Sequence, residues 1–140
     1  MSETTDQIAL MSLINQLAGL DEFGNPTQAA PRYPALRWVF HPAGERQSKA
    51  ETIRAARMGQ RAGLPDILFA QPYYDSATNT QYSGIAIELK TATGRVRPEQ
   101  DAWLKQLQRA GWFVAICREW TDAARLLIKW VGGDPREVGL

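Results

Sequence analysis

The run Ile85–Leu89 constrains the fold of this chain more than any other segment. Its sequence, Ile-Ala-Ile-Glu-Leu, places apolar side chains on both faces of an extended strand. A strand of that kind belongs inside a sheet that is covered on both faces. Near its end stands Glu88, and a carboxylate in such surroundings is costly unless a cation or another partner compensates it. The segment therefore predicts a covered sheet with a compensated acid at one end of its central strand.

The composition predicts one domain spanning residues 1–140. The chain has 140 residues and 44% hydrophobic content, which is enough for a single core. No apolar run approaches the roughly 20 residues that cross a bilayer, and the acidic start is unlike a targeting peptide, so we expect a cytoplasmic protein without membrane contacts. Because Cys117 is the only cysteine and His41 the only histidine, one chain has neither an internal disulfide nor a His/Cys zinc cage. Any metal site must use oxygen ligands.

Charge is balanced overall but uneven along the chain. The 16 Lys and Arg nearly cancel the 15 Asp and Glu. Residues 31–61, however, carry seven Lys and Arg against two Glu, a net +5, whereas residues 1–30 carry four acids and no Lys or Arg. A basic segment therefore lies immediately before the central strands.

Periodicity and capping residues predict four helices. The first spans Thr4 to about Leu20, with Ile8, Met11, Ile14 and Leu17 at helical spacing and Glu3 and Gln7 extending the same stripe. The others are expected to begin at Ser48, Pro98 and Thr121, and to end near Gly59, Gly111 and Val131.

Four short segments predict strands: Leu36–Phe40, Asp66–Ala70, Tyr82–Lys90 and Trp112–Cys117. The second and third are joined as a hairpin, and helices separate the rest. This order predicts an α/β fold in which a mixed sheet with a central hairpin is flanked by helices.

The polar residues of that hairpin predict a catalytic site. Asp66 begins one strand and Glu88 ends the next, so antiparallel pairing brings the two carboxylates level across the sheet. Lys90 faces the same way as Glu88, because side chains alternate along a strand. Two carboxylates and a carbonyl suit Mg²⁺ or Mn²⁺, which can activate water and polarise a phosphate, while a lysine offsets negative charge. The set indicates phosphodiester hydrolysis. Taken singly, Asp66 also fits a polar turn residue, and Glu88 with Lys90 a solvated charge pair.

Together these motifs resemble the PD-(D/E)XK nucleases, and within them the stand-alone VRR-NUC branch. The sequence Gly63–Asp66 resembles that family's Gly-x-Pro-Asp, Ile87–Lys90 its Ile-Glu-x-Lys, and Pro98–Leu104 its downstream Pro-x-Gln helix. Glu3 and Gln7 match a helical Glu and Gln pair, and residues 44–48 match a Gly-x-Arg-Ser loop with one additional residue. Two departures are Pro42-Ala43-Gly44, where the family often has Asn-Gly, and Arg97, where it often has Ser.

The resemblance implies a restriction-endonuclease-like fold and Mg²⁺-dependent DNA cleavage, with Mn²⁺ as a substitute. It further implies branched substrates such as flaps or four-way junctions, homodimers, and a role in bacterial or phage-infected cells. Transferred to this chain, Asp66, Glu88 and the Leu89 backbone carbonyl would hold the metal, and Lys90 would orient or activate the water. Gln100 would support the site and Glu3 would complete its acidic wall; either could equally be an ordinary structural residue.

Several alternatives remain open on the sequence alone. The basic segment is interpreted as a DNA-backbone contact or as a solvated helix face, through Arg46, Lys49, Arg54, Arg57 and Arg61. A non-cleaving DNA-binding module is the alternative to the nuclease, and an RNA-splicing type of nuclease is disfavoured by the single histidine. His41 is a loop residue or a candidate for base stacking. The first and last helices offer apolar area for a dimer, with Trp120 and Trp130 as candidate interface residues, and Cys117 is excluded as a nucleophile.

Overall fold

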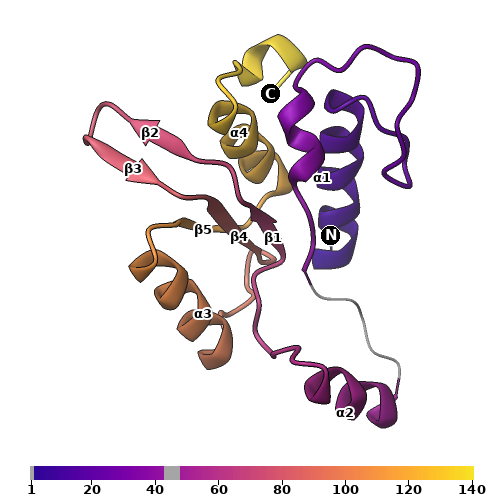
Figure 1. Cartoon of the computed structure of the whole chain (residues 1–140), viewed down its shortest axis with the longest axis vertical. Helices are drawn as coiled ribbons and strands as arrows, with labels where there is room; N and C mark the ends of the chain where they lie inside the picture. The colour runs from indigo at the N-terminus through magenta and orange to yellow at the C-terminus, as the bar shows by residue number, and fades with distance from the viewer. Residues whose placement is uncertain (1, 43–47) are drawn as a thin grey trace.

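The computed structural model describes residues 2–42 and 48–140, and Figure 1 shows the arrangement of their helices and strands. The helices are α1 (Glu3–Leu17), α2 (Lys49–Arg57), α3 (Pro98–Arg109) and α4 (Trp120–Trp130), with 3₁₀ helices η1 (Pro34–Trp38) and η2 (Pro135–Val138). The strands are β1 (Ile67–Phe69), β2 (Tyr73–Asp75), β3 (Thr80–Tyr82), β4 (Ile85–Leu89) and β5 (Phe113–Cys117).

The central sheet is mixed, as predicted. Its strand order is β1-β4-β5, with β4 antiparallel to β1 and parallel to β5, and β2 and β3 form a separate ribbon. All five residues of β4 are buried. Helices α1 and α4 pack together on one face of the sheet, while α3 packs on β5 from the other side (Figure 1). The apolar central strand is therefore covered on both faces.

Helix α1 is shorter than predicted and its buried stripe differs. Leu10, Ile14 and Leu17 are buried, whereas Ile8, which the periodicity placed on the apolar stripe, is 66% exposed. The helix ends at Leu17 because Gly19 adopts a positive φ of 76° just beyond it, a conformation that closes helix C-termini. The stripe that continues back from Leu10 passes through Gln7 to Glu3 at helical spacing, which places Glu3 toward the sheet.

The predicted strand Leu36–Phe40 is wrong, because Pro34–Trp38 forms a 3₁₀ helix. Pro34 stands at its first turn, where a fixed φ and a missing N–H are tolerated. Leu36 and Val39 lie three residues apart and are both buried, as a 3₁₀ turn requires. Only Phe40 reaches the sheet, through an isolated antiparallel bridge to Leu68.

The predicted strand Tyr82–Lys90 is interrupted at Gly84, and its outer part belongs to the β2–β3 ribbon. A side chain at Gly84 would lie 2.6 Å from the Trp112 ring and 2.7 Å from the Phe69 carbonyl oxygen. The chain therefore bends where only glycine lets the ring and the backbone approach so closely.

The C-terminal helix also departs from the prediction. Helix α4 begins at Trp120 rather than after Thr121. Trp130 is 7% exposed and stacks on Tyr73 with 4.6 Å between ring centroids, so it is a core residue and not an interface residue. Trp120 likewise packs against the core. The apolar face of α4 is used inside the domain, because α4 packs on α1 and the sheet.

Helix α2 begins at the predicted cap, where the Ser48 hydroxyl accepts the Glu51 N–H at 3.1 Å. None of its nine residues is buried, and in Figure 1 it projects from the body of the domain. Arg61 lies beyond the end of the helix, so it is not part of the solvated helix face that the sequence suggested as one alternative. Within the described residues, no helix has both the length and the apolarity needed to cross a membrane.

Candidate active site

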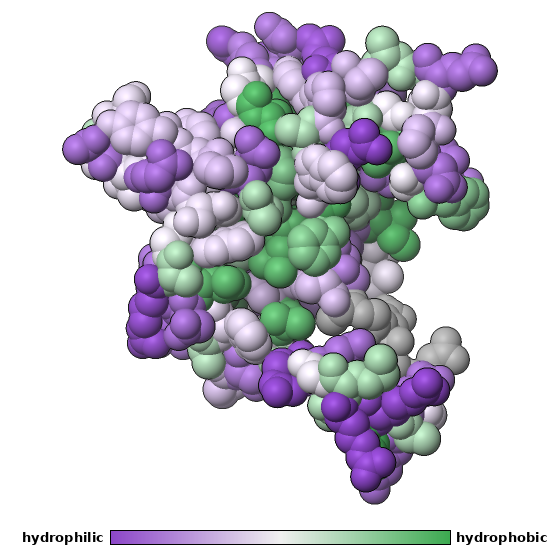
Figure 2. All heavy atoms as spheres, viewed as in Figure 1, coloured by the Kyte–Doolittle hydropathy of each residue, from purple (hydrophilic) through white to green (hydrophobic). Residues whose placement is uncertain are grey.

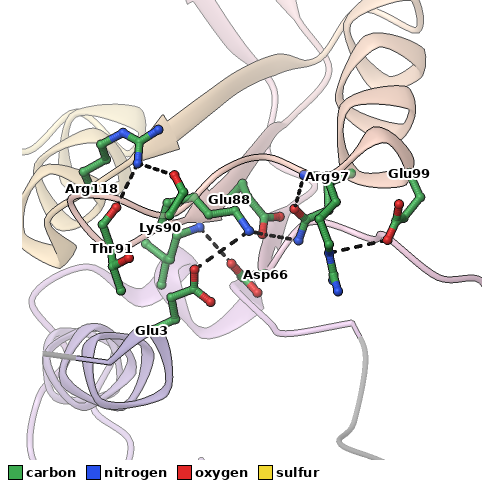
Figure 3. Close-up of polar contacts among 11 residues, drawn as sticks. Glu3, Asp66, Glu88, Lys90, Thr91, Arg97, Glu99 and Arg118 are labelled. Carbon is green, nitrogen blue, oxygen red and sulfur yellow. Dashed lines mark hydrogen bonds and ion pairs between the residues drawn. The ribbon is translucent and has the colours of Figure 1, made fainter.

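Asp66 and Glu88 lie opposite one another at one end of the sheet. The register pairs Ile67 with Ile87, so the next residue outward on β1, Asp66, is level with Glu88. The Asp66 Oδ2 atom accepts the backbone N–H of Leu89 at 2.7 Å, which ties the carboxylate to β4 (Figure 3). The structure thus brings together the two acids that the hairpin placed level in the sequence.

Glu88 is a buried acid with one unsatisfied oxygen. Its side chain is 2% exposed, and its Oε1 atom accepts a hydrogen bond from Gln100 Nε2 at 2.9 Å. Its Oε2 atom is buried and, within the described residues, has no hydrogen-bond partner. Burial raises the pKa of Glu88 to about 8, and the neighbouring Asp66 carboxylate acts in the same direction. Such an oxygen is costly unless a cation compensates it.

Lys90 lies beside Glu88 and reaches the first helix. Its ammonium is 3.6 Å from Glu88 Oε1 and 3.8 Å from Glu3 Oε1, and the side chain is 6% exposed. Its backbone N–H donates to the Cys117 carbonyl at 2.9 Å, which fixes the residue at the end of β4 against β5. Figure 3 shows Glu3, Asp66, Glu88 and Lys90 converging. The structure therefore places Glu3 in the site although it is remote in the sequence.

Gln100 connects the first turn of α3 to the buried acid. Its Oε1 atom accepts the Arg97 N–H at 2.9 Å, while its amide nitrogen donates to Glu88. The side chain is 6% exposed. The Gln100 amide therefore caps the helix at its first turn, which explains how the helix starts with Arg97 in place of the Ser that the family often has.

Two further contacts position the site and had no signal in the sequence. Arg118 Nη1 donates to the carbonyls of Thr91 at 2.8 Å and Gly94 at 2.7 Å, holding the turn that follows Lys90. His41 Nδ1 donates to the Asp66 carbonyl at 2.7 Å. Parallel pairing of β5 with β4 brings Arg118 to this end of the sheet, and no local pattern around Arg118 indicates that pairing.

The residues present fit a hard divalent cation. Two carboxylates are available, one with an unsatisfied buried oxygen, and the Leu89 carbonyl is expected on the side of Asp66 because the N–H and C=O of one strand residue point the same way. Across residues 2–42 and 48–140 there is no group of three or more His, Cys, Asp or Glu that could enclose a metal. So few protein ligands are typical of Mg²⁺, which keeps waters and takes up phosphate oxygens.

The basic residues are not part of this cluster. Lys49, Arg54 and Arg57 lie on α2 and are exposed, as is Arg61 beyond it. Arg46 lies outside the described residues. Cys117 is buried, and burial raises the pKa of its thiol to about 11, which agrees with its exclusion as a nucleophile.

The model of the VRR-NUC domain family matches residues 36–120, more than half of the chain. The chain belongs to the VRR-NUC family. The matched region of this VRR-NUC protein includes Asp66, Glu88, Lys90 and Gln100, whereas Glu3 precedes it. The domain is a PD-(D/E)XK-like nuclease, so a nuclease-type function follows from family membership.

A solved structure described as a VRR_NUC domain protein has the same fold. It is 18% identical, with a TM-score of 0.67, and the alignment covers 96% of this chain and 92% of that one. The restriction-endonuclease-like fold is thereby confirmed. A search of curated proteins found no match.

Proposed function

We propose that this VRR-NUC protein is a Mg²⁺-dependent endonuclease that hydrolyses phosphodiester bonds of DNA, with Mn²⁺ as a substitute. Its proposed substrates are branched DNA, four-way junctions or flaps, in viral or bacterial replication and repair. The observation that carries the proposal is the buried, unsatisfied Oε2 of Glu88 next to Asp66 and Lys90. A bound divalent cation would compensate this oxygen, and this supports a metal-dependent reaction.

Each residue of the site has a proposed role. Asp66, Glu88 and the Leu89 carbonyl would hold the ion, which when bound polarises a phosphoryl oxygen and acidifies water. The Lys90 ammonium would orient the attacking water and offset charge that develops on the phosphate as the P–O ester bond breaks. Gln100 holds Glu88 through Oε1 and leaves Oε2 available. Glu3 would hold Lys90 from the opposite side.

A cleavage panel tests the proposal. Labelled continuous duplex, flap, splayed-arm and four-way junction DNA are incubated with Mg²⁺, Mn²⁺, Ca²⁺ or EDTA, and metal binding is measured separately by calorimetry. We expect cleavage of branched substrates with Mg²⁺ or Mn²⁺ and none with EDTA. A folded protein that binds DNA and Mg²⁺ but cuts nothing would favour the non-cleaving DNA-binding module. Cleavage undiminished in EDTA would refute metal dependence.

Four-way junction resolution further requires a homodimer. Paired nicks on two strands need two sites related by a two-fold axis, and each chain has one. We expect light scattering to return roughly twice 15.6 kDa, with an interface above about 1,000 Å². Because the apolar face of α4 is buried inside the domain, the interface has to use other surfaces. A strict monomer on DNA would rule out junction resolution and favour nicking or flap trimming.

A further inference from the structure

The segment between η1 and the sheet exposes two large aromatic side chains. Leu36 and Val39 are 1% and 5% exposed, whereas Trp38 and Phe40 are 65% and 47% exposed. Leu36 and Val39 therefore face the core, and the two aromatic side chains face the solvent. Two exposed aromatic side chains two residues apart are a candidate contact surface for a partner.

Phe40 lies on the same face of the sheet as Asp66. Phe40 and Leu68 exchange both backbone hydrogen bonds, at 3.0 and 2.9 Å, so their side chains point to one face. Leu68 and Asp66 are two residues apart along the chain and share that face as well. The Cα atoms of Leu68 and Asp66 are about 7 Å apart along the strand. Figure 2 shows apolar surface at the centre of the molecule, over the region of β1.

The segment is held in place rather than loosely attached. Its core side is anchored by Leu36 and Val39, and its far end by the hydrogen bond from His41 to the Asp66 carbonyl. A substrate bound at the carboxylate site would therefore lie close to the fixed aromatic side chain of Phe40.

The charge around the two rings suits a polyanion. The Arg37 guanidinium lies 5.2 Å from the Trp38 ring centroid, a cation–π contact. Residues 31–42 contain no Asp or Glu, and Arg37 is the cation beside the Trp38 ring, whereas Arg32 is paired with Glu137 at 2.8 Å. Aromatic rings interleaved with cations are the means by which proteins bind unpaired nucleic-acid strands: bases stack on the rings and phosphates contact the cations. A second copy of this chain, near neutral overall, offers less charge complementarity.

We propose that Trp38 and Phe40 form an aromatic surface that stacks with unpaired nucleobases next to the cleavage site. The inference rests on the proposed function and gives its selectivity a physical cause. In a continuous duplex the bases stack on one another, so the rings have no face to bind. At a flap or a junction unpaired bases become available, and binding is gained only there.

Binding in Ca²⁺, which permits binding without turnover, tests this surface. The probes are a splayed-arm DNA with 2-aminopurine in its single-stranded arm and a continuous duplex of the same length. For Trp38→Ala and for Phe40→Ala we expect roughly tenfold weaker binding of the splayed-arm DNA and less than about a twofold change for the duplex. Trp38→Tyr and Phe40→Tyr should restore most of the affinity.

Two controls accompany these variants. Phe23 is 80% exposed and belongs to the loop between α1 and η1, so Phe23→Ala removes an exposed ring elsewhere and should leave binding unchanged. Circular dichroism and thermal melting establish that each variant folds. In addition, splayed-arm DNA should shield the wild-type protein from acrylamide quenching by an amount that Trp38→Phe abolishes, because the other tryptophans are buried or half-buried.

Every other result of the binding experiment contradicts the stacking surface. If the wild-type protein binds both DNAs and the Ala variants bind equally well, or are weakened equally on both, the stacking surface is refuted and the nuclease proposal stands. Dissociation of a wild-type dimer by Trp38→Ala without DNA would assign the surface to a second copy. If the wild-type protein binds no DNA, both proposals fail.

Discussion

Strand β4 and helix α2 carry charged residues in opposite surroundings. In β4 every residue is buried, and Lys90 just beyond it is 6% exposed. In α2 no residue is buried. The buried groups Glu88 and Lys90 are held by neighbours at set distances. The exposed charges of α2 are solvated and are screened by salt. Strand β4 can therefore position side chains for a reaction, whereas α2 can contribute only electrostatic attraction to a polyanion.

The largest effect is expected in the buried region. Asp66→Ala, Glu88→Ala and Lys90→Ala should each lower the cleavage rate by about a thousandfold or more, because these groups stabilise a transition state in a water-poor site. Single-turnover assays under saturating DNA measure the rate. EDTA should have the same effect on the wild-type protein. A Glu88→Ala protein that is folded by circular dichroism and cleaves at the wild-type rate would refute the site.

The second-largest effect is expected at Gln100, which also belongs to the buried region around Glu88. Gln100→Ala removes the donor that holds Glu88, and we expect roughly 10- to 100-fold weaker metal binding and slower cleavage. Calorimetry with Mn²⁺ and single-turnover rates measure the two effects. Gln106 is exposed on the same helix, so Gln106→Ala is the matched control. Equal behaviour of the two variants would reduce Gln100 to a helix cap.

The basic segment should change affinity and not rate. Replacing Arg46, Arg54 and Arg57 together with Ala should weaken DNA binding in Ca²⁺ and lower the slope of log K against log salt by about 0.9 for each phosphate that the protein no longer neutralises. The single-turnover rate on saturating DNA should stay unchanged. The control replaces Arg109, Lys129 and Arg136, which are exposed outside residues 31–61. An unaltered slope would reassign the α2 charges to solvation.

The smallest effect concerns stability without metal. The pKa of Glu88 is about 8 in the folded protein, above its ordinary value of 4.5, so the folded state binds more protons than the unfolded state between these values. The free energy of unfolding in EDTA should therefore fall as pH rises from about 5 to about 8.

Thermal and urea unfolding between about pH 5 and pH 9 measure this dependence. Glu88→Gln should flatten it and be the more stable protein at the alkaline end, because an amide has no proton to lose. Mg²⁺ should then stabilise the wild-type protein at that pH and not the variant. Parallel curves for the two proteins would show that Glu88 is not the titrating group.

Local signals predicted several of the elements around the candidate site and the basic segment. Ser48 and Pro98 mark the starts of α2 and α3, and the apolar run Ile85–Leu89 indicates a buried central strand. These signals work because caps and side-chain alternation act over a few residues. They failed at Leu36–Phe40, where the same apolar residues suit a strand or a 3₁₀ turn, and at Gly84, whose need for close packing comes from Trp112.

By itself the sequence determined that an α/β fold carries two acids and a lysine on a central hairpin, because a hairpin brings together residues that are near in the chain. Only the tertiary structure decided what surrounds them. Glu3 reaches Lys90 because α1 packs on the sheet, and Arg118 reaches the turn after Lys90 because β5 lies parallel to β4. The tertiary structure also decided that Oε1 of Glu88 accepts a hydrogen bond and that Oε2 has no partner within the described residues. Contacts between distant segments depend on how the whole core packs, and no stretch of residues encodes that packing locally.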